Sequence, residues 1–118
     1  MRELLKDIVN GYDGVIKSVV LNENFKEIRV VLAVNSLSRG EWIDLHFNFT
    51  GVKEFCVKQK KNFSNTVLSD GLFYDERKGI KYMDFLPLCE EMTLEEIRES
   101  EFYVAADDMT YTIENYSA

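Results

Sequence analysis

The sequence contains little of what marks an unusual class of protein. Its 118 residues include 1 proline, 6 glycines, 2 cysteines and 1 histidine. So little proline and glycine excludes collagen-like and low-complexity chains, and 46% apolar with 30% charged residues exclude a disordered chain. A chain of this length has room for one hydrophobic core, so we expect a single domain over residues 1–118.

No segment has the long apolar run of a membrane span or a secretory signal. Charged residues interrupt the N-terminal residues 1–7, and no later window approaches the roughly 18 apolar residues that a span needs. We therefore expect a cytoplasmic protein without membrane contact. In that reducing compartment, Cys56 and Cys89 are expected to be small buried side chains, with a disulfide as the alternative.

The residues that carry catalysis or bind metals and cofactors are sparse. His46 and Asp44 lie two apart, as a general base and its orienting carboxylate on one strand face would, but no nucleophile motif accompanies them. The adjacent acids Glu90-Glu91 and Asp107-Asp108 could be paired catalytic carboxylates, yet such pairs are more typical of solvated turns. No zinc, calcium or phosphate-loop spacing is present. The sequence predicts a non-enzymatic protein without cofactor or metal.

What the sequence does have is acid, unevenly distributed. Residues 1–68 contain 10 Lys and Arg against 8 Asp and Glu, a balance of +2, and residues 69–118 contain 4 against 13, a balance of −9, which gives −7 in total. An acidic surface repels nucleic-acid backbones and anionic membranes and accelerates association with a basic protein. The charge predicts a basic protein partner and no nucleic acid. Acids that only maintain solubility are the simpler explanation for any one cluster.

The first half of the chain has the periodicity of a short helix followed by strands. Residues 2–10 have the apolar spacing of a helix that ends at Asn10-Gly11. A strand is expected over residues 15–21, which are rich in β-branched residues, and two more are expected over residues 26–35 and 41–49, where apolar and polar residues alternate. Because only a few residues connect these strands, we expect an antiparallel meander with one buried face.

The second half predicts shorter elements. A further strand is expected over residues 51–58, with either Phe55 and Val57 or Val52 and Cys56 facing inward, and a basic loop over residues 58–61 follows it. The other expected strands cover residues 72–74, 80–85, 102–106 and 109–114, with a loop at 75–79 and a turn at Asp107-Asp108.

The segment Met92-Thr93-Leu94-Glu95-Glu96-Ile97 is the most specific local signal. Thr93 and Glu96 have the spacing of a capping box, and Met92 and Ile97 have that of a hydrophobic staple, so a helix is expected near residues 93–101. Together the elements predict an α+β fold, mainly an antiparallel β meander or half-barrel with a short N-terminal helix and this second helix. A β-sandwich with incidental helices is the alternative.

Two segments of the first half carry a resemblance. They are Tyr12-Asp13-Gly14-Val15-Ile16 and Phe47-x-Phe49-x-Gly51-Val52-x-x-Phe55. They resemble short bacterial β-rich families of unknown function, in which a His-Asp-small-x-aliphatic opening precedes a meander and a Phe-x-x-Val-x-x-Phe strand. Tyr12 stands where those families usually have His. Some of these families are immunity proteins of polymorphic toxin systems, so the resemblance implies a class of protein but no functional residue.

The sequence therefore predicts an acidic binding protein, for which an immunity protein that neutralises a basic toxin is the concrete case. The residues expected to contact the partner are Glu90, Glu91, Glu95, Glu99, Asp107, Asp108 and Trp42. Trp42 is included because tryptophan is enriched at binding hot spots, and burial of this side chain is the equal alternative. The alternative function is a small homo-oligomeric structural or assembly protein, and the protein is expected to be a monomer or homodimer.

Overall fold

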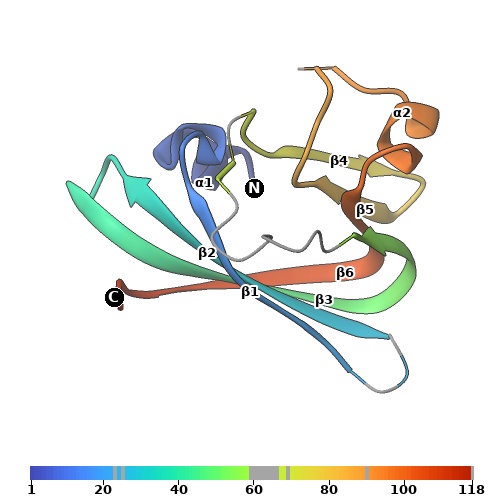
Figure 1. Cartoon of the computed structure of the whole chain (residues 1–118), viewed down its shortest axis with the longest axis horizontal. Coiled ribbons are helices and arrows are strands. Elements are labelled where there is room, and N and C mark those ends of the chain that lie inside the picture. The colour runs from blue at the N-terminus through green and yellow to red at the C-terminus, as the bar shows by residue number, and fades with distance from the viewer. Residues whose placement is uncertain (23, 25, 59–66, 69, 90, 118) are drawn as a thin grey trace.

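The computed structural model describes residues 1–22, 24, 26–58, 67, 68, 70–89 and 91–117. Within them the chain forms one six-stranded antiparallel sheet and two short α-helices (Figure 1). In chain order the elements are α1 (Arg2–Asp7), the 3₁₀ turn η1 (Val9–Gly11), β1 (Val15–Leu21), β2 (Glu27–Ser36), β3 (Glu41–Val57), β4 (Phe73–Arg77), β5 (Ile80–Asp84), α2 (Leu94–Arg98) and β6 (Phe102–Asn115). The predicted α+β class is confirmed. The β-sandwich alternative is not, because all six strands belong to one sheet.

The first three strands form the predicted meander, and the later strands depart from it. β1 pairs with β2 and β2 pairs with β3, both antiparallel. Their buried faces align because Val30 lies opposite Phe47 and Leu32 opposite Leu45, and all four are buried. The strand order is β1-β2-β3-β6-β5-β4, so the last strand of the chain lies between β3 and the β4–β5 hairpin.

β3 and β6 are long continuous strands, which corrects the prediction of two short strands in each segment. β3 runs through the predicted break at residue 50 to Val57, and β6 runs through Asp107-Asp108. The two strands pair with each other from Ile43 opposite Asn115 to Val57 opposite Phe102. Phe55 and Val57 contact the main core, but so does Val52 from the other predicted phase, because the register shifts between Val52 and Glu54, and neither predicted phase holds over the whole segment.

Both long strands bend at the same level, where Gly51 and Asp107 lie between the pairs of Thr50 with Asp108 and Val52 with Ala106, next to a register shift between Val52 and Glu54. Thr50 and Gly51 are both exposed, so the alternation of buried and exposed faces is interrupted on β3. Asp107 and Asp108 are likewise both exposed on β6. Gly51 has a φ of +62°, and a Cβ atom there would lie 2.7 Å from Asp107 Oδ2. The adjacent acids therefore mark a bend within a strand and not the predicted turn.

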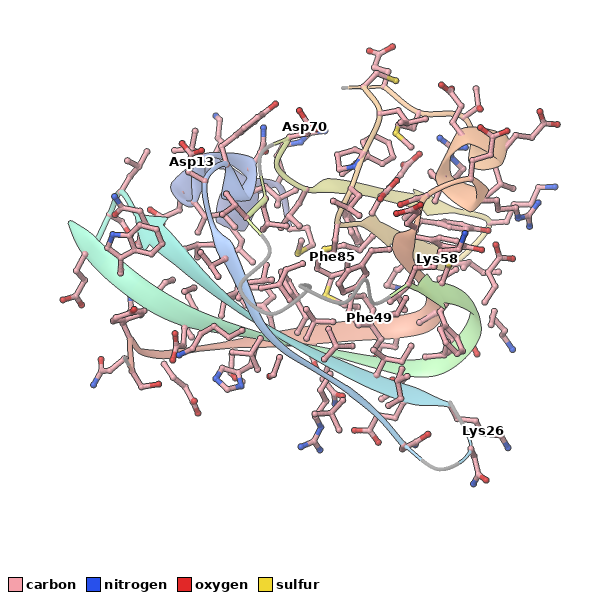
Figure 2. The ribbon with its side chains drawn as sticks, viewed as in Figure 1. Asp13, Lys26, Phe49, Lys58, Asp70 and Phe85 are labelled. Atoms are coloured by element: carbon pink, nitrogen blue, oxygen red, sulfur yellow. The ribbon has the colours of Figure 1, made fainter. Side chains whose placement is uncertain are left out.

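The bent sheet encloses a core rich in phenylalanine. The ring centroids of Phe49 and Phe85 are 6.4 Å apart, and those of Phe85 and Phe102 are 4.5 Å apart. Figure 2 shows Phe49 and Phe85 between the long strands and the β4–β5 hairpin. In Figure 1, α1 lies on the same side of the long strands as this hairpin, so both cover the core.

α1 ends earlier than the sequence predicts. A helix over residues 2–10 is expected from the spacing, but α1 ends at Asp7. Leu4 and Ile8 are buried as expected. Val9 has a φ of +51°, which is not helical, and its side chain is 50% exposed. The predicted helix would have buried Val9 on its apolar face.

The β4–β5 hairpin has a tighter turn than predicted. A loop over residues 75–79 is expected from composition, whereas only Lys78 and Gly79 connect the strands. Both have positive φ, +52° and +78°, as a two-residue type I′ turn requires. Residues 75–77 therefore belong to β4, and Arg77 pairs with Ile80 beside the turn.

The predicted capping box at the start of α2 is confirmed. The Thr93 hydroxyl accepts from the Glu96 N–H at 3.2 Å, and the Thr93 N–H donates to Glu96 Oε1 at 2.9 Å. Met92 and Ile97 are buried together against Tyr82 and Tyr103. Because the neighbouring strand residues face the main core, α2 packs on the opposite face of β5 and β6.

Thr93→Ala is expected to lower the free energy of unfolding by about 1 kcal/mol, because the Glu96 N–H loses its acceptor. Urea denaturation followed by circular dichroism measures the change. Thr93→Ser is the matched control, since serine keeps the acceptor oxygen and should be close to wild type. Equal stability of the two variants would show that the capping interaction contributes nothing.

The two cysteines are free thiols, and only one is even partly buried. Cys56 is half-buried and Cys89 is exposed, so the prediction of two buried side chains is wrong for Cys89. Cys89 follows Pro87 in the loop before α2, where its Sγ lies 2.8 Å from the carbonyl oxygen of Glu91. Apart from Lys58, the predicted basic loop over residues 58–61 lies outside the described residues.

Candidate functional site

The residues predicted to contact a partner fall into three separate places. Glu91, Glu95 and Glu99 lie in the loop before α2, within α2 and at its C-terminal cap. Asp107 and Asp108 lie at the bend of β6, and Trp42 lies near the start of β3. All six side chains are exposed. Glu90 lies outside the described residues.

The three glutamates around α2 form what we call the α2 acidic surface (Glu91, Glu95 and Glu99). Within the described part of the chain, none of their carboxylates forms an ion pair. The one basic residue of α2, Arg98, donates two hydrogen bonds to Glu54 on β3, at 2.9 and 3.2 Å. The charge of Arg98 is thus matched by Glu54, and the α2 acidic surface keeps its negative charge.

The Arg98–Glu54 pair also fixes α2 against the sheet. The Arg98 guanidinium lowers the pKa of Glu54, and burial together with the nearby Glu54 charge raises the pKa of Tyr103 to about 12. Tyr103 donates its hydroxyl hydrogen to Glu54 at 3.2 Å. The tyrosine therefore stays a neutral donor at physiological pH, and Glu54 stays ionised beside Arg98.

Asp107 and Asp108 have a different environment from the α2 acidic surface. Asp107 Oδ2 lies 3.3 Å from Lys53 Nζ, and Lys81 donates to the Asp107 carbonyl oxygen at 3.2 Å. Asp108 Oδ1 accepts the N–H of Met109 at 2.9 Å. Lys53 on β3 and Lys81 on β5 thus lie beside Asp107. Along the sequence, Arg98 is the one basic residue close to the predicted acidic residues.

Trp42 lies far from α2, near the C-terminal end of the chain. Its ring is 43% exposed and lies 6.4 Å from the ring of Tyr116, and Lys17 Nζ lies 5.2 Å from the Tyr116 ring centroid. The C-terminus and α2 lie at opposite ends of the molecule in Figure 1. A partner that contacts both would have to extend along the whole sheet.

Asp44 is the centre of a polar cluster that sequence reasoning missed. Its Oδ2 accepts from Lys17 Nζ at 2.7 Å and from the N–H and hydroxyl of Ser117 at 3.2 and 2.9 Å. Burial raises the pKa of Asp44, but the hydrogen bonds from Lys17 and Ser117 outweigh it and the pKa lies below its ordinary value. The cluster fastens the end of the chain to the sheet. No local signal marks it, since Ser117 is 73 residues away.

The pairing of His46 with Asp44, which a general base would need, is not made. His46 Nε2 lies 2.8 Å from Glu114 Oε2 on the neighbouring strand β6. The hydrogen bonds that Asp44 accepts from described residues all go to its Oδ2, from Lys17 and Ser117. His46 and Glu114 are both partly exposed and make a polar contact across two neighbouring strands.

Asp84 is a buried carboxyl that has no counter-ion among the described residues. Its Oδ1 accepts from Ser100 Oγ at 2.6 Å and from the Leu86 N–H at 2.9 Å, whereas its buried Oδ2 has no hydrogen-bond partner in the part of the chain that the structure describes. Burial raises the pKa of Asp84. Because the folded-state pKa lies above the unfolded one, this group costs stability as the pH rises through and above the usual aspartate range. The hydrogen bond from Ser100 ties β5 to the residues that follow α2. The Asp84 side chain is 0% exposed, so it does not face a substrate.

In the described residues, no group of three or more His, Cys, Asp and Glu side chains is arranged to hold a metal ion. Neither α1 nor α2 is long and apolar enough to cross a bilayer, and no other described segment forms such a helix. Comparisons with protein-family models, with curated proteins and with solved structures find no match to this chain.

Proposed function

We propose that this protein is a non-enzymatic binding protein whose α2 acidic surface receives a basic region of a partner protein. The observation that carries the proposal is the charge balance around α2. Arg98 is already matched by Glu54, whereas Glu91, Glu95 and Glu99 are exposed without ion pairs among the described residues. Lysine or arginine side chains of a partner would supply the missing charge.

The physical advantage of such a surface is speed of association. Exposed unpaired acids attract a basic protein over a distance of about one Debye length, roughly 8 to 10 Å in physiological salt. The attraction accelerates encounter by about 10-fold or more and weakens as salt is added. A protein that must capture its partner before the partner acts benefits from this kind of steering.

The specific form that we propose is an immunity protein that binds and blocks a basic toxin. The acidic surface supports this form, because a toxin that acts on nucleic acid carries basic residues toward the phosphate backbone. The resemblance of the segments at residues 12–16 and 47–55 to β-rich families that include immunity proteins supports it as well.

The test compares two double variants with the same change in net charge. Glu95→Lys with Glu99→Lys reverses the α2 acidic surface, and Glu3→Lys with Glu41→Lys reverses two exposed acids elsewhere. The partner is first isolated by co-purification with the tagged protein at low salt, and association rates are then measured at several salt concentrations. We expect the α2 variant to associate about 10-fold more slowly at low salt, with a flatter salt dependence, and the control to differ little.

Equal association rates for the two variants would contradict the role of the α2 acidic surface. The exposed pair Trp42 and Tyr116 would then be the better binding surface. The immunity form is tested separately with the isolated partner. If a saturating concentration of this protein leaves the enzymatic activity of the partner unchanged, the immunity role is wrong, whereas the binding role is not contradicted.

A further inference from the structure

β4 is an edge strand, and the hairpin register shows which of its backbone groups point away from β5. Arg77 and Ile80 flank the two-residue turn, so they form a hydrogen-bonded pair. Bonded and non-bonded pairs alternate along an antiparallel ladder. The pairs of Tyr74 with Met83 and of Glu76 with Lys81 are therefore non-bonded, and the N–H and C=O groups of Tyr74 and Glu76 point to the free edge.

One hydrogen bond at the start of this edge supports the assignment. Leu72 is the next residue in the same alternating series, and its N–H donates to the Asn10 carbonyl oxygen of η1 at 2.7 Å. Beyond Leu72, the Glu76 N–H reaches only the adjacent Asp75 side chain, at 2.8 Å. Within the described part of the chain, the Tyr74 N–H and the carbonyl groups of Tyr74 and Glu76 have no hydrogen-bond partner.

A cavity lies alongside this edge. Its volume is about 540 Å³, and its lining includes Leu5, Leu72, Tyr74 and the exposed Leu88. An adjoining cavity of about 420 Å³ shares Leu5 and Tyr74 and extends the space to Glu76. Residues of α1 and of β4 both line the second cavity, among them Arg2, Leu5 and Lys6 from α1.

We propose that this cavity receives an extended peptide segment of another protein, which adds as a further strand beside β4. The N–H and C=O groups that point to the open edge belong to every second residue, and an extended chain is the ligand whose own backbone groups repeat at that spacing. Alternate apolar side chains of the peptide would contact Leu5, Tyr74 and Leu88. The site is separate from the α2 acidic surface and does not depend on its role.

A second copy of this protein fits the edge less well than a foreign peptide. In the register that sets Tyr74 opposite Glu76, two paired β4 edges place Asp75 of one copy opposite Asp75 of the other. Each carboxylate already pairs with Arg77 at 2.7 Å, and like charges in that position are destabilising to the extent that these pairs do not offset them. The second copy would also bring its own α1 into the space that α1 bounds here. A single extended segment avoids both problems.

The test uses peptides selected from a random library displayed on phage against the full-length protein. The tightest binder is synthesised unmodified and in two forms, N-methylated at every odd or at every even residue. We expect the unmodified peptide to slow amide hydrogen exchange at Tyr74 and Glu76. We expect one N-methylated form to bind at least about 10-fold more weakly, because it loses the donors that face β4, and the other form to bind nearly as well.

A protein variant tests the same edge from the other side. Glu76→Pro removes the edge-facing N–H of residue 76, which in the protein alone donates to the Asp75 side chain, and edge strands tolerate proline. Glu76→Ala keeps that N–H and is the control. We expect weaker peptide binding for the proline variant alone.

Three results would overturn the proposal. They are selected peptides that leave the exchange of Tyr74 and Glu76 unchanged, equal weakening by both N-methylated forms, and protection of these amides that rises with the concentration of the protein alone. The last result would identify a second copy as the occupant. Because N-methylation leaves the protein unaltered, the outcome does not depend on whether Glu76→Pro folds.

Discussion

Phe85→Ala is expected to lower the free energy of unfolding by about 3 to 5 kcal/mol. Phe85 is 0% exposed and packs against Phe49 on β3 and Phe102 on β6. Its backbone N–H also donates to the Phe102 carbonyl oxygen at 2.9 Å, so the chain around it is held in place. Removing the ring leaves a cavity that the hydrogen-bonded strands cannot close.

Urea denaturation followed by far-ultraviolet circular dichroism measures this loss. Leu88→Ala is the matched control, because Leu88 lies three residues later and is 69% exposed, and its change should stay within about 0.5 kcal/mol. A loss below about 1 kcal/mol for Phe85→Ala would mean that the β4–β5 hairpin does not close the core as described.

Gly51→Ala is expected to cost about 2 to 5 kcal/mol, the sum of a backbone and a contact effect. The φ of +62° at Gly51 is strained for any residue with a Cβ, which costs about 1 to 2 kcal/mol. The new methyl group would also lie 2.7 Å from Asp107 Oδ2 and 2.9 Å from Asp107 Cβ, and relieving such overpacking costs about 1 to 3 kcal/mol more.

Gly40→Ala separates the two effects. Gly40 has nearly the same φ, +64°, but nothing lies within 4 Å of a Cβ at that position. Denaturation midpoints of both variants should therefore show a smaller loss for Gly40→Ala. Similar losses for the two would show that the contact with Asp107 has no energetic weight, and the bend of β3 and β6 would then need another cause.

The contrast between these positions explains which parts of the fold are predictable. Capping at Thr93 depends on Glu96, three residues away, so the pattern is visible in the sequence. The strands before residue 50 follow from local composition and alternation, and the short turns between them make them neighbours in the sheet. β3 continues through Gly51 because it pairs with β6 on both sides of that residue, Thr50 with Asp108 and Val52 with Ala106, whereas composition alone favours a break at both places.

The candidate site shows the same division. That Glu91, Glu95 and Glu99 are exposed follows from their charge, and their clustering around α2 follows from proximity in the chain. That Arg98 is matched by Glu54 could not be predicted, because β3 brings Glu54 to α2 across 44 residues. The contact of Lys53 with Asp107 could not be predicted either. It gives the acids at the bend of β6 a positive neighbour, which the α2 acidic surface lacks among the described residues.

The sequence by itself determined the class of fold, the period-2 strands and the start of α2, because each rests on residues within one or two turns of one another. The tertiary structure alone decided the strand order, the burial of Asp44 and the open edge of β4. Each of these depends on which distant segment arrives beside another: β6 next to β3, Ser117 over Asp44, and α1 across from β4. Which distant segment lies beside a given strand is settled only when the whole chain folds, so the local sequence pattern does not show it.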